Sequence, residues 1–401
     1  MTDRPRIAGR AGRHPPSLTL ELKRIAAELA ARGRPVWDFG LGETKGDLAP
    51  HIRDAGSRAF LDEHTQYGNP AGLLELRQAA LRWLDLGEYG TDDVVITGGA
   101  KQGLFNVFLA LCSPGDTVLV DSAPWVSYLP MIDAAGARAQ VVQPAAGARN
   151  HLKTSAADLG REFDAHPGAR LFLINSPVNP TGQVYTAAEL EALLAVCVER
   201  RAFFVLDRLY WRLVFDGAEF PPPRVDAETK PWLIQVDGLS KNFRRTGGIR
   251  IGWTIAPTDL THAMVNLQSH YTSGPPIPTQ LAALAGISKP YDPELRNDLE
   301  RKRNLLRDAT CRIPQLSVWP TAGAFYSFWD VRSCFGKETP NGTPINSSSD
   351  LARYLLDSAG VVTAPGSAFC QEGYLRISFA TPDDHITNGA RAVGEALAAL
   401  R

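Results

Sequence analysis

The chain has 401 residues, a formal net charge of −1 and an apolar content of 44%. A nearly neutral protein has no overall field that would attract nucleic acid or an anionic membrane surface, so neither is expected as a partner. The length favours two domains, or one large domain with a smaller lobe, over a single simple core.

Cysteine and histidine usage argues against a disulfide framework and against a metal site. The five cysteines are scattered along the chain: Cys112, Cys197, Cys311, Cys334 and Cys370. Their spacing favours reduced thiols in a cytoplasmic protein. The eight histidines form no close ligand pair, so no metal is expected. The Arg-rich N-terminus lacks the apolar core of a secretory signal, and no apolar segment approaches the length of a membrane span.

Helices are expected first near the N-terminus. Apolar residues recur at helical spacing in three segments: residues 18–32, 50–62 and 71–86. Ser17 can cap the first of these helices, and residues 1–16 are expected to form a loose arm. The segment 36–43 is short, extended and ends in glycines, while Gly and Pro content predicts a loop at 67–72.

Short apolar runs dominate the chain from residue 94 onward. We expect strands at 94–97, 117–120, 139–142, 170–175, 202–207, 232–236 and 249–256. Helices are expected at 102–111, from Trp125 onward and at 187–200. Apolar runs that do not alternate with polar residues, separated by helices, are typical of a mostly parallel sheet with helices on both faces. Ligands of such sheets usually bind beyond the carboxyl ends of the strands.

The pattern changes after about residue 285. A long charged helix is expected at 293–307 and a closing helix at 385–400, with strand-like pieces at 316–318, 324–328 and 375–379. These elements predict a smaller α+β domain, completed by the N-terminal segment. We therefore assign residues 46–285 to a large domain, and residues 1–45 with 286–401 to the arm and small domain.

Lys241 is the first candidate for covalent chemistry. It comes shortly after the apolar run that ends at Val236. A lysine just past a buried strand loses hydration, which lowers its pKa and frees the amine as a nucleophile. A Schiff-base lysine needs this property. Arg250, in the next apolar segment, could hold a phosphate. The alternative is a surface lysine in a basic loop.

Other side chains at strand ends suit a flat, phosphorylated ligand. Gly99, Ala100 and Lys101 form a glycine-rich turn into a helix, where free N–H groups favour a phosphate. Trp125 could stack on a flat ring, or pack in the core. Asp207 ends a buried strand, where a carboxylate is costly unless it meets a cation such as a protonated ring nitrogen.

Two further sites carry polar groups with specific geometry. Asn175-Ser-Pro-Val-Asn-Pro-Thr-Gly182 contains two Asn turns and two prolines, which fix the backbone around Asn179. Arg376 lies inside an otherwise apolar strand and needs an anion. A substrate carboxylate held by its planar fork is the natural partner, and a structural salt bridge is the alternative.

Together these runs resemble the class I and II aminotransferases, which are fold type I enzymes dependent on pyridoxal 5′-phosphate. The resemblance covers residues 36–380 and rests on Ser240-Lys-Asn-Phe243, Gly248-Ile-Arg-Ile-Gly252, Asn175 to Gly182 and Asp207-Arg-Leu-Tyr210. It implies that Lys241 carries the cofactor as a Schiff base and that Asp207 faces the pyridine nitrogen. Asn179 and Tyr210 would contact the ring oxygen.

The same resemblance assigns the remaining contacts. The expected cofactor contacts are Tyr67, Gly99, Ala100, Lys101, Trp125, Asn179, Asp207, Tyr210, Lys241 and Arg250. The expected substrate contacts are Gly42, Lys101, Asn179 and Arg376. In the family, the residue matching Tyr67 reaches the phosphate in the neighbouring subunit. This implies a homodimer with shared active sites.

The match is closest to the bacterial aspartate aminotransferase subgroup, so the expected reaction joins an L-amino acid to a 2-oxo acid. In that subgroup the lysine matching Lys101 meets a distal carboxylate, which favours an acidic substrate; alternatively only its backbone matters. Elimination, replacement or carbon–carbon bond formation could use the same deprotonated intermediate. A DNA-binding regulator with an aminotransferase-like domain is disfavoured, because the segment before the fold is too short for a helix-turn-helix domain.

Several positions depart from the family pattern. Arg208 stands where the family has Glu, at a position that does not contact the cofactor. Lys45 and Asp47 are expected to reshape the substrate entrance, and the bulky 270–271 and 275–276 pairs fall in a segment that lines the partner's site. Arg250 follows Lys241 by one residue more than usual, so a β-bulge would be needed to restore its position.

Overall fold

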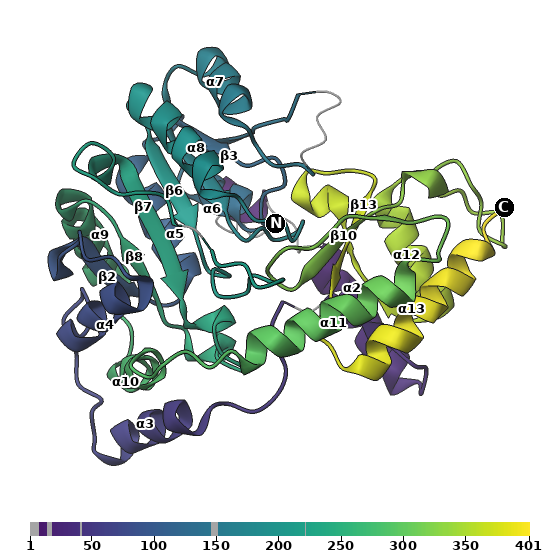
Figure 1. The fold of residues 1–401 in the computed structure, drawn as a ribbon, viewed down its shortest axis with the longest axis horizontal. Helices are drawn as coiled ribbons and strands as arrows, with labels where there is room; N and C mark the ends of the chain where they lie inside the picture. The colour runs from purple at the N-terminus through teal and green to yellow at the C-terminus, as the bar shows by residue number, and fades with distance from the viewer. Residues whose placement is uncertain (1–7, 14–17, 41, 146–150, 221) are drawn as a thin grey trace, which may run out of the picture.

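The structure is a computed structural model that describes residues 8–13, 18–40, 42–145, 151–220 and 222–401. Ser17 and most of the predicted arm lie outside these ranges; residues 9–12 form the short helix α1 (Gly9–Gly12). The molecule has two lobes, a larger one built on a seven-stranded sheet and a smaller one built on a four-stranded sheet (Figure 1).

The larger sheet has the strand order β2-β8-β7-β6-β5-β3-β4. Its strands are β2 (Val94–Thr97), β3 (Thr117–Val120), β4 (Arg138–Val141), β5 (Ala169–Asn175), β6 (Phe203–Asp207), β7 (Leu233–Gly238) and β8 (Gly252–Ile255). Strand β8 runs antiparallel to β2 and β7, whereas β3 to β7 are mutually parallel. The predicted strands are present within a few residues, but the strand expected at 249–256 is shorter, because residues 247–249 form a 3₁₀ turn.

Helices cover both faces of this sheet. One face carries α5 (Ala100–Leu111), α6 (Tyr128–Ala134) and α9 (Thr258–Tyr271), and the other carries α7 (Ala156–Ala165) and α8 (Ala187–Glu199). Successive side chains of β5 alternate between the two cores, with Leu171 and Leu173 on the α5 side and Phe172 and Ile174 on the α8 side. The predicted fold, a mostly parallel α/β sheet with helices on both faces, is confirmed.

A third core closes the β2–β8 end of the sheet. It contains α4 (Leu74–Leu84) and α10 (Ile277–Ile287), and α10 also packs on α3 (Pro50–Leu61). Helix α10 was not expected from the sequence, because it is apolar on most of its surface and shows no helical stripe. Short 3₁₀ turns connect many elements: η1 (Thr91–Asp93), η2 (Lys230–Trp232), η3 (Leu239–Lys241), η4 (Gly247–Ile249), η5 (Arg332–Cys334) and η6 (Gly366–Phe369).

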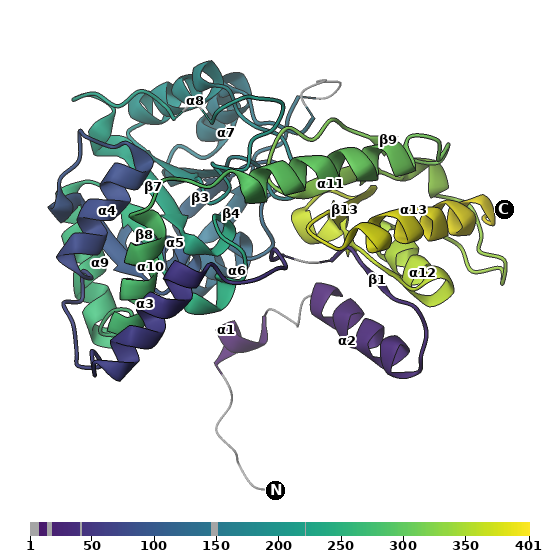
Figure 2. The ribbon, with the colours of Figure 1, turned by 60° about the horizontal axis from the view of Figure 1, so that its bottom comes forward.

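The smaller lobe combines both ends of the chain. Its sheet has the order β12-β13-β10-β9, formed by β9 (Ser317–Val318), β10 (Tyr326–Asp330), β12 (Ala364–Pro365) and β13 (Tyr374–Ser378). Strand β1 (Trp37–Asp38) pairs with β11 (Val361–Val362). The helices are α2 (Leu18–Ala31), α11 (Glu294–Thr310), α12 (Ser348–Ala359) and α13 (Asp383–Ala398). Figure 2 shows α2 on the side of this lobe, so the N-terminal segment completes it; the exact domain boundaries stay a prediction.

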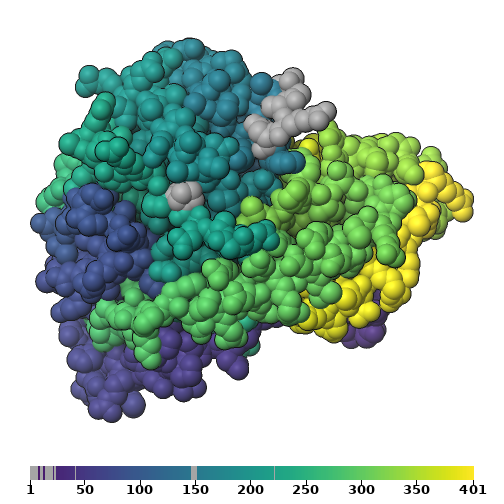
Figure 3. All heavy atoms as spheres, in the orientation of Figure 1, coloured from purple at the N-terminus to yellow at the C-terminus, as the bar shows by residue number. Residues whose placement is uncertain are grey.

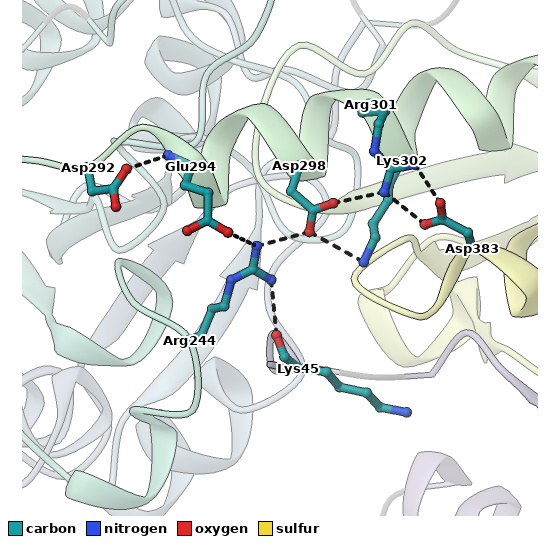
Figure 4. Close-up of polar contacts among 8 residues, drawn as sticks. All are labelled: Lys45, Arg244, Asp292, Glu294, Asp298, Arg301, Lys302 and Asp383. Atoms are coloured by element: carbon teal, nitrogen blue, oxygen red, sulfur yellow. Dashed lines mark hydrogen bonds and ion pairs between the residues drawn. The ribbon is translucent and has the colours of Figure 1, made fainter. Parts of the chain in front are cut away.

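Helix α11 extends from the larger lobe across to the smaller one, as the green surface in Figure 3 shows. An ion-pair network follows its first half (Figure 4). Asp298 pairs with Arg244 at 3.1 Å and with Arg301 at 2.9 Å, and Arg301 pairs with Asp383 of α13 at 2.6 Å. Because Arg244 lies three residues after Lys241, this network joins the loop beyond Lys241 to both α11 and α13.

Candidate active site

A cavity of about 540 Å³ lies between the lobes, at the carboxyl ends of β5, β6 and β7. Most of the predicted site residues line it: Gly42, Ala100, Lys101, Trp125, Asn179, Asp207, Tyr210, Lys241, Arg250 and Arg376. Gly99 immediately precedes Ala100, whereas Tyr67 is 92% exposed and does not line the cavity within this chain. The topology therefore brings together side chains from seven separate segments.

Lys241 ends the turn η3, directly after the buried strand β7. Its Nζ donates a hydrogen bond to the carbonyl oxygen of Gly42. Burial lowers the pKa of Lys241 to about 8, although the nearby Glu43 carboxylate acts in the opposite direction. A larger share of this amine is therefore neutral near pH 7 than for a solvated lysine.

Asp207 is the last residue of β6 and is 5% exposed. Burial raises the pKa of this carboxyl to about 6, and hydrogen bonds from Tyr128 Oη (2.7 Å) and the Leu209 amide (3.2 Å) partly offset the rise. Tyr128 was not singled out from the sequence. The helix expected from Trp125 begins only at Tyr128. The Tyr128 side chain, at this first position of the helix, reaches the Asp207 carboxylate.

Tyr210 and Asn179 face the same cavity from the loops after β6 and β5. Tyr210 Oη lies 3.2 Å from Tyr326 Oη, a second partner that sequence reasoning missed. The backbone of Asn179 is fixed by its N–H, which donates to Asn175 Oδ1 at 2.8 Å, as the double Asn turn predicts. Asn179 Oδ1 accepts from Arg376 Nη1 at 3.1 Å, so its amide nitrogen is available to donate to a ligand.

Arg376 enters the cavity from β13 and is only 6% exposed. Its Nη2 donates to the Gly40 carbonyl at 3.4 Å, and its guanidinium lies 4.5 Å from the centre of the Tyr326 ring. Its Nε is buried without a hydrogen-bond partner. Within the described chain Arg376 forms no ion pair, so the structural salt bridge considered as an alternative is absent and the charge suits an anionic ligand.

The start of α5 and Arg250 form one end of the cavity. Gly99 has φ +90°, and a Cβ there would lie 2.5 Å from Arg250 Nη2, so only glycine fits. Gly252 lacks the Cβ that would collide with the Ala100 amide. The first N–H groups of α5 have no intrahelical acceptor. These donors and the guanidinium suit a phosphate.

The extra residue between Lys241 and Arg250 does not displace the arginine from the cavity. The predicted β-bulge is wrong: a 3₁₀ turn, η4, takes up the additional length, and Arg250 follows it with φ +60°. Arg250 donates to the carbonyl oxygens of Gly247 (2.9 Å) and Gly98 (3.2 Å), which hold it beside α5.

Lys101 and Trp125 lie at the cavity wall that faces solvent. Lys101 Nζ is 4.8 Å from the centre of the Trp125 ring. Partial burial, and secondarily the charge of Arg250, lower the pKa of Lys101. Trp125 lines the cavity and also packs edge-on against Tyr128, with 5.5 Å between ring centres, so both predicted alternatives, a ring that faces a ligand and core packing, stay open.

Glu43 lines the cavity, and its Oε1 accepts from the Gly247 amide at 3.0 Å. Lys45 and Asp47 do not line the cavity itself, and their predicted effect on the substrate entrance stays a prediction. Lys45 instead offers its carbonyl to Arg244 at 3.1 Å. The expectation that residues 270–271 and 275–276 line the site of a partner subunit stays a prediction.

A buried network supports the two catalytic loops from the opposite side of the sheet. Asp237 accepts from Trp211 Nε1 at 3.1 Å and from Asn242 Nδ2 at 3.3 Å, which ties the loop after β6 to the turn that carries Lys241. Arg208 is 1% exposed there and donates to Gln235 Oε1 at 2.6 Å. Its side chain does not line the cavity, as expected for this departure.

The described residues contain neither a metal-binding cluster nor a membrane-spanning helix. No group of three or more His, Cys, Asp or Glu side chains there could hold a metal ion. No helix among the same residues is long and apolar enough to cross a bilayer.

Comparison with known sequences gives a consistent result along the whole chain. A family model described as aminotransferase class I and II matches residues 34–393. An aspartate aminotransferase of Geobacillus stearothermophilus is 32% identical over 394 residues, covering 97% of this chain and 98% of the relative. A probable aspartate/prephenate aminotransferase of Aquifex aeolicus is 33% identical over 399 residues, covering 98% of both proteins.

Solved structures give the same relationship. The crystal structure of the aspartate aminotransferase from Rhizobium meliloti matches with a TM-score of 0.92 at 30% identity, covering 99% of this chain and 100% of that one. The Thermus thermophilus aspartate aminotransferase, solved with maleate, matches with a TM-score of 0.88 at 29% identity, covering 98% and 100%.

Proposed function

The chain belongs to the class I and II aminotransferases and is an enzyme of that kind, and we propose that it holds pyridoxal 5′-phosphate covalently on Lys241. The observation that supports this most is the convergence of Lys241, Asp207, Asn179 and Tyr210 on one cavity. The unpartnered Nε of Arg376, the glycine at position 99 and the free amides of α5 leave room and donors for an anionic cofactor and substrate.

The side chains that line the cavity would then divide the chemical roles among them. When bound, the cofactor supplies an electron-withdrawing ring that stabilises negative charge at the substrate Cα. Asp207 would keep the ring nitrogen protonated, and Asn179 and Tyr210 would donate to the ring oxygen. Lys241, with its amine free, would take the Cα proton as general base and would later deliver a proton as general acid. Its lowered pKa suits a general base near neutral pH.

The substrates are an amino acid and a 2-oxo acid, and we assign their α-carboxylate to Arg376. Its planar fork, oriented by Asn179 and the Gly40 carbonyl, matches a carboxylate. Lys101 lies at the solvent-facing wall, where a distal carboxylate of an acidic amino acid would be placed. Relatives named for aspartate support this choice of substrate.

We further propose a homodimer in which Tyr67 reaches the phosphate of the partner subunit's site. Tyr67 is 92% exposed, and Phe60 and Leu61 on the preceding helix end are 63% and 76% exposed. Large apolar side chains gathered on one surface favour a protein partner. A cytoplasmic location is supported by the free state of all five cysteines. Sedimentation of the enzyme at low concentration would reveal a monomer if the dimer proposal fails.

The Lys241→Ala variant tests the covalent assignment. We expect it to lose the absorbance band of lysine-bound pyridoxal phosphate, and to lose at least about 10³-fold in kcat, because both the attachment point and the general base are removed. Lys230→Ala, a change to a lysine outside the cavity, serves as the control. A Lys241→Ala protein that keeps the lysine-bound spectrum would refute the assignment.

The Lys101→Ala variant tests the preference for acidic substrates. We expect kcat/KM for aspartate to fall by roughly 10- to 100-fold, the value of a hydrogen bond to a charged group, while that for alanine changes little. Conversion of the bound cofactor to its amine form distinguishes transamination from elimination or replacement. Unchanged kcat/KM for both amino acids would assign the role of this position to its backbone alone, because Lys101→Ala keeps the backbone.

A further inference from the structure

A second cavity, of about 370 Å³, lies apart from the active site, between α4 and the segment that follows α10. Its lining contains three cationic side chains, Arg82, Arg212 and Lys289, and two aromatic ones, Trp83 and Tyr291. The other lining residues are Ala79, Ile287, Ser288 and Pro290, so no carboxylate belongs to this described wall. Three positive charges around one hollow repel one another unless an anion enters.

Arg212 is the most constrained of the three cations. Its guanidinium lies between aromatic rings, at 3.9 Å from the centre of Trp83, 4.1 Å from Trp211 and 4.4 Å from Tyr291. Its Nε is buried without a partner, and Nη2 makes one long bond of 3.4 Å to the Trp83 carbonyl. The rings fix the orientation of the fork, while most of its hydrogen-bonding capacity is left unused.

Two acidic groups close to the aromatic lining are already engaged elsewhere. Asp237 lies beyond Trp211 and accepts from that indole and from Asn242. Asp292 follows Tyr291, but its Oδ1 accepts from the Glu294 amide at 2.9 Å, at the start of α11. Within the described chain, neither Arg82, Arg212 nor Lys289 forms an ion pair; Asp237 acts on Arg212 only from a longer distance.

We propose that this cavity is a binding site for a phosphate-type oxyanion, held by the fixed fork of Arg212 and closed by Arg82 and Lys289. A planar guanidinium binds two oxygens of a tetrahedral anion at once, and the flexible flanking cations reach the others. Because Arg212 is already oriented by three rings, binding orders little additional structure. The site is separate from the one that would hold the cofactor phosphate, and it does not depend on the proposed reaction.

The test is a titration with inorganic phosphate, in the presence of saturating pyridoxal phosphate so that the active-site phosphate position is filled. Calorimetry at fixed ionic strength, with chloride as the competing salt, should give saturable binding to the wild type. The Arg82→Gln/Lys289→Gln double variant changes two exposed side chains and should weaken binding by about tenfold or more. Arg212→Lys keeps the charge but removes the fork, and should also weaken it.

The matched control is Arg353→Gln/Arg391→Gln, which removes the same charge from exposed positions on α12 and α13. It should bind phosphate like the wild type. The proposal is overturned if phosphate binds no better than chloride, or if the Arg82→Gln/Lys289→Gln variant keeps the wild-type affinity. Equal weakening in the control would also overturn it, because the effect would then be one of net charge.

Discussion

Two buried arginines on opposite sides of the catalytic loops have almost the same local chemistry and different consequences. Arg376 is 6% exposed and Arg208 is 1% exposed, and neither forms an ion pair within the described chain. Arg376 faces the cavity, with an unused Nε and one face on the Tyr326 ring. Arg208 lies behind the sheet, where it bonds Gln235 and lies 5.0 Å from the centre of the Trp211 ring.

The difference between the two arginines shows that burial alone does not identify a binding site. Both guanidiniums carry the desolvation cost of a charge removed from water. For Arg208, the Asp237 carboxylate and the surrounding rings offset part of that cost permanently, since nothing can enter. For Arg376, the cost is offset only when an anion occupies the cavity. A buried cation indicates a binding site when it borders open space, and a structural role when it does not.

The largest expected effect would separate these two arginines directly. Arg376→Ala should lower kcat/KM by roughly 10²-fold, mainly through KM, because a charged hydrogen bond to the substrate carboxylate is lost. Arg208→Met should leave kcat/KM within about threefold, because this side chain does not line the cavity, and should lower stability instead, because the buried Gln235 Oε1 loses its donor. Steady-state kinetics and thermal unfolding of both variants measure this. Comparable kinetic losses in the two would remove the distinction.

A smaller effect is expected at Tyr128, on the cavity side. Its hydroxyl donates to Asp207 and lowers the pKa of that carboxyl, which burial raises. Tyr128→Phe should therefore raise the pKa of Asp207 further, reduce kcat/KM by about tenfold at neutral pH, and shift the acidic limb of the pH profile upward. Tyr326→Phe is the control, because that phenol contacts Tyr210 instead. An unshifted acidic limb in Tyr128→Phe would contradict this role.

The smallest effect on activity is expected at Asp237, on the side of the sheet away from the cavity, where the predicted effect is on stability. Burial raises the pKa of Asp237 from its ordinary value to about 7, so the folded protein holds this proton more tightly than the unfolded chain does. Stability from this group is present at low pH and is lost as pH rises from about 4 to 7, at up to about 1.4 kcal/mol per pH unit. Asp237→Asn should remove that slope.

Urea unfolding of the cofactor-free protein between pH 4.5 and 8 measures the slope. Asp207 contributes in the same direction up to about pH 6, so the comparison of wild type with Asp237→Asn is sharpest between pH 6 and 7. Asp93→Asn is the control: the pKa of this buried carboxyl is lowered below its ordinary value, so it stays ionised throughout this range and the variant should keep the wild-type slope. Identical slopes in wild type and Asp237→Asn would exclude Asp237 as the titrating group.

Much of the fold and the cavity could be read from local sequence. Strands β2 to β7 are short apolar runs, and their carboxyl ends carry Asn175, Asp207 and the turn to Lys241, so parallel pairing alone brings these residues to one edge. The double Asn turn around Asn179 is likewise a local property. These features were predictable because each depends on residues adjacent in the chain.

Other contacts depend on packing between distant segments and left no local pattern. Tyr128 meets Asp207 across 79 positions and Tyr326 meets Tyr210 across 116. The turn η4, which places Arg250, was predicted as part of a strand. The two isoleucines that flank Arg250 are as typical of a strand as of a turn that packs on the core. Helix α10 lacks a polar face because α3 and α4 cover it, and so it shows no helical period.

The ion-pair network along α11 should make the contacts between its helices depend on salt concentration. Arg301 is 53% exposed and Asp383 49%, so their attraction is open to screening by dissolved salt. The apolar interior of the smaller lobe has no such sensitivity. Concentrated salt should therefore weaken the contact of α13 with α11 inside the smaller lobe, and to a lesser degree the more buried Arg244–Asp298 contact that joins α11 to the larger lobe. Ionic strength would then control how rigidly the larger and the smaller lobe are connected.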